Sequence, residues 1–88
     1  MTHLISQIAN FEQCNSGIPN GLIRAAAADY VADVWADGNA LATAMEKGQV
    51  DFSEEVAAFN SELEDLDCET RASADDLEAG LKNWMEAR

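Results

Sequence analysis

Basic side chains are scarce in this chain. Its 88 residues include 17 acidic residues and only 5 lysines and arginines, which gives a formal net charge of −12 and a pI near 4.1. Nucleic acids and anionic membrane surfaces are polyanions, so we expect the chain to bind neither of them directly. Hydrophobic residues nevertheless make up 48% of the sequence, which is enough to form a core and argues against general disorder.

Long hydrophobic runs and most metal-binding residues are also missing. No apolar stretch approaches the roughly 18 residues of a membrane-spanning helix. The N-terminal residues lack the basic start and apolar centre of a signal peptide, so the expected location is cytoplasmic. One histidine, His3, and two distant cysteines, Cys14 and Cys68, argue against a zinc site. A disulfide is possible in principle, but in a cytosolic chain we expect two reduced thiols.

Apolar residues recur at helical spacing almost throughout the chain, and no strand-like alternation of useful length is present. We expect a helix at 4–11, a loop at 15–21, a helix at 22–37, a short helix ending before 48, a helix at 52–69 and a last helix after 73. This pattern predicts an all-α protein. Residues 1–88 would form a single acidic domain, a compact bundle of four to five short helices.

Two arrangements are open between the second and third helices. Gly38 could end the second helix with Asn39 capping the third, or one helix could continue to Lys47. We favour the break. Asp51 and Ser73 each begin a sequence that resembles a capping box, and we expect a helix to start at both.

Each expected helix has an apolar face. In the second helix it comprises Leu22, Ile23, Ala26, Ala27, Tyr30, Val31, Val34 and Trp35. In the helix at 52–69 it comprises Phe52, Val56, Phe59, Leu63 and Leu66, and in the last helix Leu77, Leu81, Trp84 and Met85. The second helix has a further face of small residues, Ala25, Ala28, Ala32 and Ala36. Such a face admits a closely packed helix, either from within the chain or from a second copy.

Acidic residues are concentrated between Asp51 and Glu78, where eleven acids accompany one base, Arg71. In the helix expected at 52–69, five of these acids fall within about 100 degrees of arc on one flank. They are Glu54, Glu55, Glu62, Asp65 and Glu69. No base lies within this flank to form the usual i,i+4 ion pairs.

The second helix adds Asp29, Asp33 and Asp37 at four-residue spacing. A continuous helix would stack these carboxylates at steps of about 6 Å. Phosphates of a DNA strand follow one another at a comparable interval, with an axial rise of about 3.4 Å. Asp37 borders the apolar arc, so it could instead be partly covered or cap Asn39. Acidic surfaces also serve solubility, and short acidic rows arise by chance in acidic chains.

Two segments of the sequence partly match the calcium-binding loop of an EF-hand. Residues 33–38 match the first, fifth and sixth positions of the loop, but Trp35 and Ala44 stand where oxygen ligands are required. A second frame, 43–54, places Lys47 at a ligand position. We expect no calcium site.

Catalytic and carrier motifs are not found either. The chain has no Asp-Ser-Leu tripeptide of the kind that carries an acyl-carrier arm, and His3, Cys14 and Cys68 have no evident activating neighbour. We therefore expect neither an enzyme nor a bound cofactor.

In character the chain resembles the small acidic proteins that phages encode against host defence. The nearest class is the anti-CRISPR proteins that act as DNA mimics, followed by anti-restriction mimics. The resemblance rests on the chain length, the low pI, the missing enzyme motifs and two helical acid rows. These rows are Asp29, Asp33 and Asp37, and Glu55, Glu62 and Glu69. The class has no shared motif, so no family residue is carried over.

The resemblance implies that the protein occupies a basic DNA channel, or the site that reads a recognition motif, in a CRISPR effector or restriction enzyme. The candidate partner-binding residues are Asp29, Asp33, Asp37, Glu54, Glu55, Glu62, Asp65 and Glu69. We expect a monomer or weak dimer in the host cytoplasm. The alternative is a helical interaction module, such as an antitoxin or regulatory subunit, that binds a basic partner without mimicking DNA.

Overall fold

The computed structural model describes residues 20–66, 68 and 70–87. Four α-helices form this part of the chain: α2 (Asn20–Trp35), α3 (Gly38–Glu46), α4 (Phe52–Asp65) and α5 (Ala74–Glu86). No strand occurs among the described residues, and the expected all-α fold is confirmed. The helix expected at 4–11 and most of the loop expected at 15–21 lie outside them.

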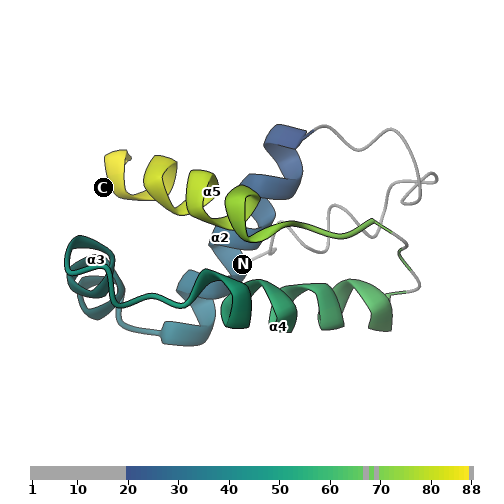
Figure 1. The fold of residues 1–88 in the computed structure, drawn as a ribbon, viewed down its shortest axis with the longest axis horizontal. Helices are drawn as coiled ribbons and strands as arrows, with labels where there is room; N and C mark the ends of the chain where they lie inside the picture. Colours follow the sequence, from purple (N-terminus) through teal and green to yellow (C-terminus); the bar gives the residue numbers. More distant parts are fainter. Residues whose placement is uncertain (1–19, 67, 69, 88) are drawn as a thin grey trace.

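Helix α2 is the central element (Figure 1). It contacts α3, α4 and α5, and α4 also contacts α5. The buried residues of α2 are Ile23, Ala26, Ala27, Ala28 and Val31. They project to several sides of the helix, so α2 lacks a single apolar stripe, which is the pattern of a helix enclosed by its neighbours.

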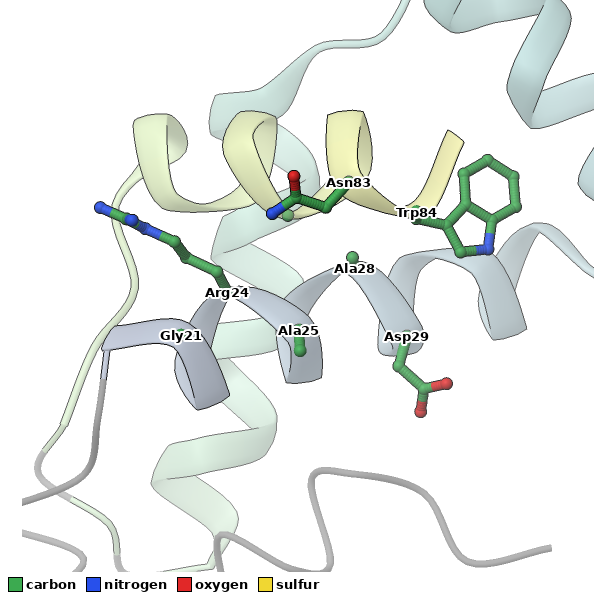
Figure 2. A pocket seen from close by; sticks show the side chains of 8 residues that line it. Gly21, Arg24, Ala25, Ala28, Asp29, Asn83 and Trp84 are labelled. Carbon is green, nitrogen blue, oxygen red and sulfur yellow. The ribbon is translucent and has the colours of Figure 1, made fainter. Parts of the chain in front are cut away.

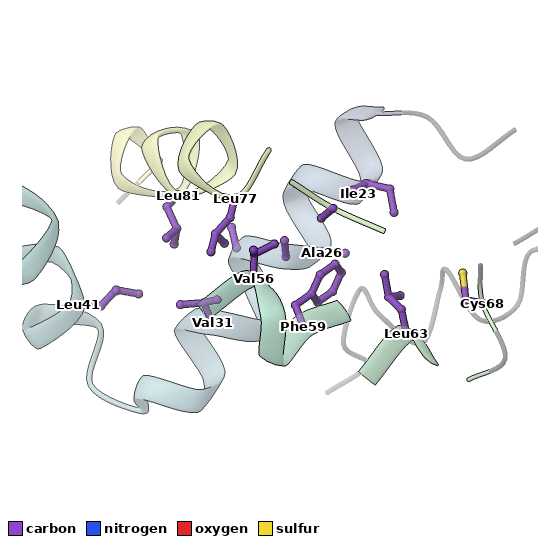
Figure 3. Packing of buried hydrophobic residues seen from close by; sticks show 13 residues of the cluster. Ile23, Ala26, Val31, Leu41, Val56, Phe59, Leu63, Cys68, Leu77 and Leu81 are labelled. Atoms are coloured by element: carbon purple, nitrogen blue, oxygen red, sulfur yellow. The ribbon is translucent and has the colours of Figure 1, made fainter. Parts of the chain in front are cut away.

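The core combines side chains from all four helices with two from the α4–α5 connection, Cys68 and Ala72 (Figure 3). Its largest fully buried members are Phe59, Leu41, Leu63, Leu77, Leu81 and Val31. The expected apolar faces are confirmed for most positions, with two exceptions. Val34 is 59% exposed and Leu66 is 44% exposed. Val34 lies in the last turn of α2, where the chain turns away, and Leu66 lies beyond α4, where helical spacing no longer applies.

The expected break after α2 is confirmed, but different residues form it. Ala36 adopts the left-handed conformation, with φ of 63°. Asp37 then caps α3, because its carboxylate accepts hydrogen bonds from the backbone N–H of Asn39 (3.0 Å) and Ala40 (3.2 Å). Gly38 is the first residue of α3 rather than the last of α2. Asp37 therefore lies outside α2.

Both expected helix starts are confirmed. Asp51 accepts from the N–H of Glu54 at 3.1 Å, and Ser73 forms a reciprocal capping box with Asp76. Asp76 also pairs with Arg24 Nε of α2 at 3.1 Å, which ties α2 to the start of α5. The pKa of Asp76 is lowered, chiefly by the hydrogen bond from the Ser73 backbone N–H. Burial acts in the opposite direction, and the contacts with Arg24 and the Ser73 hydroxyl lower the pKa further.

The α4–α5 connection is held to the bundle by Asn60. Its side-chain nitrogen donates to the carbonyl of Ala72 (2.9 Å), and its oxygen accepts from the Ala72 N–H (2.8 Å). Arg71 donates to the carbonyls of Cys68 and Thr70. α4 ends at Asp65, four residues earlier than expected, because the chain turns here to bury Cys68 and Ala72.

Cys68 is disulfide-bonded, so the expectation of reduced thiols is wrong for this structure. The only other cysteine in the sequence is Cys14, which is therefore the one partner available within the chain. Its own position lies outside the described residues. A separation of 54 positions along the chain gives no information on distance in space, and the sequence could not reveal the bond.

Candidate interaction surface

The strongest concentration of charge lies on α4. This helix has five acidic residues and no basic one. Its buried side is formed by Val56, Phe59 and Leu63. The acidic flank, which we define as Glu54, Glu55, Glu62 and Asp65, lies beside that apolar face: Glu55 is half-buried and the other three are exposed. Because three core side chains fix the rotation of α4, the flank is a rigid array rather than a mobile tail.

Tyr30 of α2 borders the acidic flank. Its ring packs against Phe59 of α4, with ring centroids 5.9 Å apart and planes tilted by 52°. Burial raises the pKa of the Tyr30 phenol, and the negative charges of Glu62 and Glu55 raise it further. The sequence predicts Tyr30 only as part of an apolar arc. Its place beside two carboxylates depends on how α2 crosses α4, which helical periodicity does not specify.

Three of the four described bases have partners away from the acidic flank. Arg24 pairs with Asp76, Lys82 pairs with Glu78 at 3.5 Å on α5, and Arg71 donates to backbone carbonyls. Within the part of the chain that the structure describes, no base forms an ion pair with any of the four residues of the acidic flank. The sequence-based expectation of an unneutralised flank holds for these four positions; Glu69, the fifth, is outside the described residues.

The expected row of three aspartates is not continuous. Asp33 is exposed on α2, but Asp37 serves as the cap of α3, and the left-handed Ala36 interrupts the helix between them. Asp29 is half-buried and lines a groove against α5. The phosphate-like spacing predicted for the row is therefore wrong beyond Asp33, because the helix ends at Trp35.

This groove, which we call the α2–α5 groove, has a volume of about 340 Å³. Its lining includes the small residues Ala25 and Ala28 of α2 and Gly80 of α5. Arg24 lies at one end of the groove and Trp84 at the other, with Asn83 between them (Figure 2). A Cβ at Gly80 would overlap the carbonyl oxygen of Arg24 and lie 3.3 Å from Ala28 Cβ, so the two backbones nearly touch. Part of the predicted small-residue face thus packs inside the molecule: Ala28 is 3% exposed.

Among the described residues no group of three or more His, Cys, Asp and Glu side chains is arranged to hold a metal ion. None of the described helices is long and apolar enough to cross a membrane. His3 and Cys14 fall outside the described part of the chain, and Cys68 is held in its disulfide rather than available as a nucleophile.

No protein-family model matches the chain, and comparisons with curated proteins and with solved structures gave no match.

Proposed function

We propose that this protein inhibits a nucleic-acid-binding defence complex by occupying its basic DNA channel, as DNA-mimic anti-CRISPR proteins do. The targets would be CRISPR effectors or, second, restriction enzymes. The observation that carries the proposal is the acidic flank of α4, four carboxylates that no described base pairs with. The proposal assigns binding and no catalytic step to the protein, and it involves no direct contact with nucleic acid or membrane.

The carboxylates of the acidic flank repel one another, and no described base pairs with them. Like charges on neighbouring helical turns destabilise a helix by a few tenths of a kcal/mol per pair, and high net charge adds a general penalty on the compact state. A channel lined with Arg and Lys would convert this repulsion into attraction. Each carboxylate could accept charge-assisted hydrogen bonds, and the counterions that screen both surfaces would be released.

Rigidity favours this surface over a flexible acidic tail. The buried Phe59 and Leu63 fix α4 on the bundle, so its carboxylates need little further ordering when they bind. Tyr30 adds an amphipathic ring at the edge of the flank, beside Glu55 and Glu62. Tyrosines in such positions are common anchors in protein interfaces.

The test compares two variants with the same change of charge. Glu55→Gln, Glu62→Gln and Asp65→Asn neutralise the acidic flank; Glu46→Gln, Asp75→Asn and Glu86→Gln neutralise three exposed acids on α3 and α5. Binding to a panel of purified guide-loaded CRISPR effectors and restriction enzymes is measured at increasing salt. The flank variant should lose several kcal/mol, at about 1.5–3 kcal/mol per charged hydrogen bond, and the control variant much less.

Competition with DNA completes the test. A short target duplex should displace the wild-type protein from its partner, and binding should weaken steeply with salt. If the flank variant binds and inhibits at full strength, or if one partner holds DNA and this protein together, the mimic proposal is wrong. An interaction module that binds through other faces, such as an antitoxin, would then replace it.

A further inference from the structure

Helix α3 buries fewer residues than any other described helix. It is nine residues long, and its buried side chains are Leu41 and Ala44, whereas α2, α4 and α5 each bury at least three residues. A helix of this length is not stable by itself in water, so these few apolar contacts must keep α3 in place. Elements with few buried contacts are the ones that open at the lowest cost in folded proteins.

A residue with positive φ lies close to each end of α3. Ala36 precedes the helix with φ of 63°, and Gly48 follows it with φ of 66°. The chain bends sharply at both residues, so torsional changes at these two points can swing α3 without rearranging α2 or α4. The strain at Ala36 is relieved once the residue is free to leave the left-handed conformation, and this favours opening.

Hydrogen bonds within the segment 37–49 hold α3 together as a unit. Asp37 caps its first turn, as described above. At the other end the N–H of Gln49 donates to the carbonyl of Ala44 at 2.9 Å, across the bend at Gly48. Donor and acceptor both belong to the segment in each case, so these bonds persist when the segment moves as one body.

The last turns of α2 form an apolar stripe beside α3. Val31, Val34 and Trp35 are spaced i, i+3 and i+4, which places them on one side of α2, the helix that α3 contacts most. Val31 is fully buried, Trp35 is half-buried and Val34 is exposed, so the stripe is covered only in part. Leu41 points from α3 toward the rest of the core (Figure 3).

We propose that α3 is a flap, residues 37–49, that opens as one unit by turning on Ala36 and Gly48 while α2, α4 and α5 stay packed. Opening removes Leu41 from the core and uncovers the apolar stripe of α2. The protein therefore has a closed form and a less populated open form with different apolar surfaces. The acidic flank of α4 is the same in both forms, so this inference does not depend on the proposed function.

Amide hydrogen exchange on the full oxidised chain, at urea concentrations below the unfolding transition, tests the flap. Amides of residues 41–47 should exchange at least about tenfold faster than the most protected amides of α2 and α4. Their exchange should also depend little on urea, because a local opening exposes little surface. Protection of α3 equal to that of α4, or an equal dependence on urea, would overturn the proposal.

Two truncations of fully buried leucines separate local opening from global unfolding. Leu41→Ala removes the main contact of the flap and should speed exchange of the α3 amides at least about thirtyfold. Leu63→Ala, at the opposite end of the core (Figure 3), is the matched control and should speed exchange far more in α4 than in α3. An equal increase in both helices of Leu63→Ala would mean that α3 opens only when the whole protein unfolds, and the proposal would be wrong.

Ala36→Gly tests the hinge without destabilising the fold. It removes the strain from the closed form, so the α3 amides should exchange about fivefold more slowly than in the wild type. Unchanged exchange in α3 would contradict the assigned hinge. This variant decides the question even if neither leucine truncation folds.

Trp35 reports whether opening uncovers the stripe, since Trp84 is the only other tryptophan in the chain. In a Trp84→Phe background, the fluorescence of Trp35 should shift to longer wavelength in Leu41→Ala and not in Leu63→Ala. Fast exchange of α3 in Leu41→Ala without this shift would mean that the stripe stays covered, which also overturns the proposal.

Discussion

Ala36 is the only residue other than glycine with a positive φ in the described backbone. It adopts φ of 63°, a conformation that costs a residue with a Cβ about 1–2 kcal/mol. The strain arises because α2 must end at Trp35 so that the chain can turn into α3, and the sequence offers alanine rather than glycine at that point. The sequence favoured Gly38 for this role, since glycine is the usual residue there. Whether Ala36 or Gly38 takes the left-handed conformation depends on where α3 must lie to bury Leu41. That position is set by packing between helices and not by the local sequence.

Replacing Ala36 by glycine should therefore stabilise the protein. The strain energy removed from the folded state exceeds the extra conformational entropy that glycine adds to the unfolded chain. We therefore expect the free energy of unfolding to rise by about 1 kcal/mol. Ala58→Gly, at an exposed helical position in α4, is the control and should cost about 1 kcal/mol. Urea unfolding of the two variants measures both effects. A loss of stability in Ala36→Gly would contradict the assigned strain.

Between elements, the α2–α5 crossing depends on Gly80. A Cβ there would overlap the carbonyl oxygen of Arg24 and lie 2.9 Å from its carbonyl carbon, and backbone atoms cannot move aside as a side chain can. Gly80→Ala should cost about 1–3 kcal/mol. Gly21→Ala, where a Cβ meets nothing within 4 Å, should be neutral or stabilising by up to about 1 kcal/mol. Thermal unfolding of both variants would reveal the difference, and equal effects would contradict the close approach.

The α2–α4 contact can be followed through Tyr30, the only tyrosine in the chain. Burial, followed by the charges of Glu62 and Glu55, raises its pKa above 10.0. The unfolded chain therefore loses the phenolic proton first, and stability should fall as the pH rises through the pKa of the folded protein. Glu55→Gln with Glu62→Gln should lower the pKa, measured by ultraviolet absorbance titration. Glu46→Gln with Glu86→Gln should leave it nearly unchanged, and an equal shift in both pairs would refute the contact.

Local signals predicted the four described helices but not the relations between them. The spacing of Val56, Phe59 and Leu63 and the caps at Asp51 and Ser73 are properties of neighbouring residues, and they were predicted correctly. The lone Arg24 gave no sign that it would meet Asp76, because that pair joins residues 52 positions apart. The α2–α5 groove, Tyr30 beside Glu62 and the disulfide at Cys68 were missed for the same reason.

For the whole molecule, the disulfide at Cys68 is a large contribution to stability. A bond to Cys14 would close a loop of roughly 54 residues, and the loss of chain entropy in the unfolded state is worth about 4 kcal/mol. Reductant should lower the free energy of unfolding of the wild type by up to this amount. The free energy of unfolding of Cys14→Ser, which cannot form the bond, should be the same with and without reductant. Urea unfolding with and without reductant measures the difference. Peptide mapping that recovered both cysteines alkylated from the native protein would show that the bond does not form.

The net charge of −12 acts on the molecule as a whole, and salt should reveal its cost. Raising the ionic strength from about 0.01 M to 0.15 M shortens the screening length from about 30 Å to about 8 Å. Repulsion between the helices then weakens, so the melting temperature of the wild type should rise. The variant that neutralises Glu55, Glu62 and Asp65 should be more stable at low salt and less sensitive to added salt.

The variant that neutralises Glu46, Asp75 and Glu86 separates local crowding from total charge. Both variants have the same net charge, so an equal gain in stability would mean that repulsion is spread over the molecule. A larger gain for the flank variant would mean that the carboxylates of α4 oppose folding locally. That outcome, combined with loss of inhibition in the same variant, is expected if the flank is maintained for a basic partner at the expense of stability. A wild-type melting temperature that falls with salt would contradict the assigned repulsion.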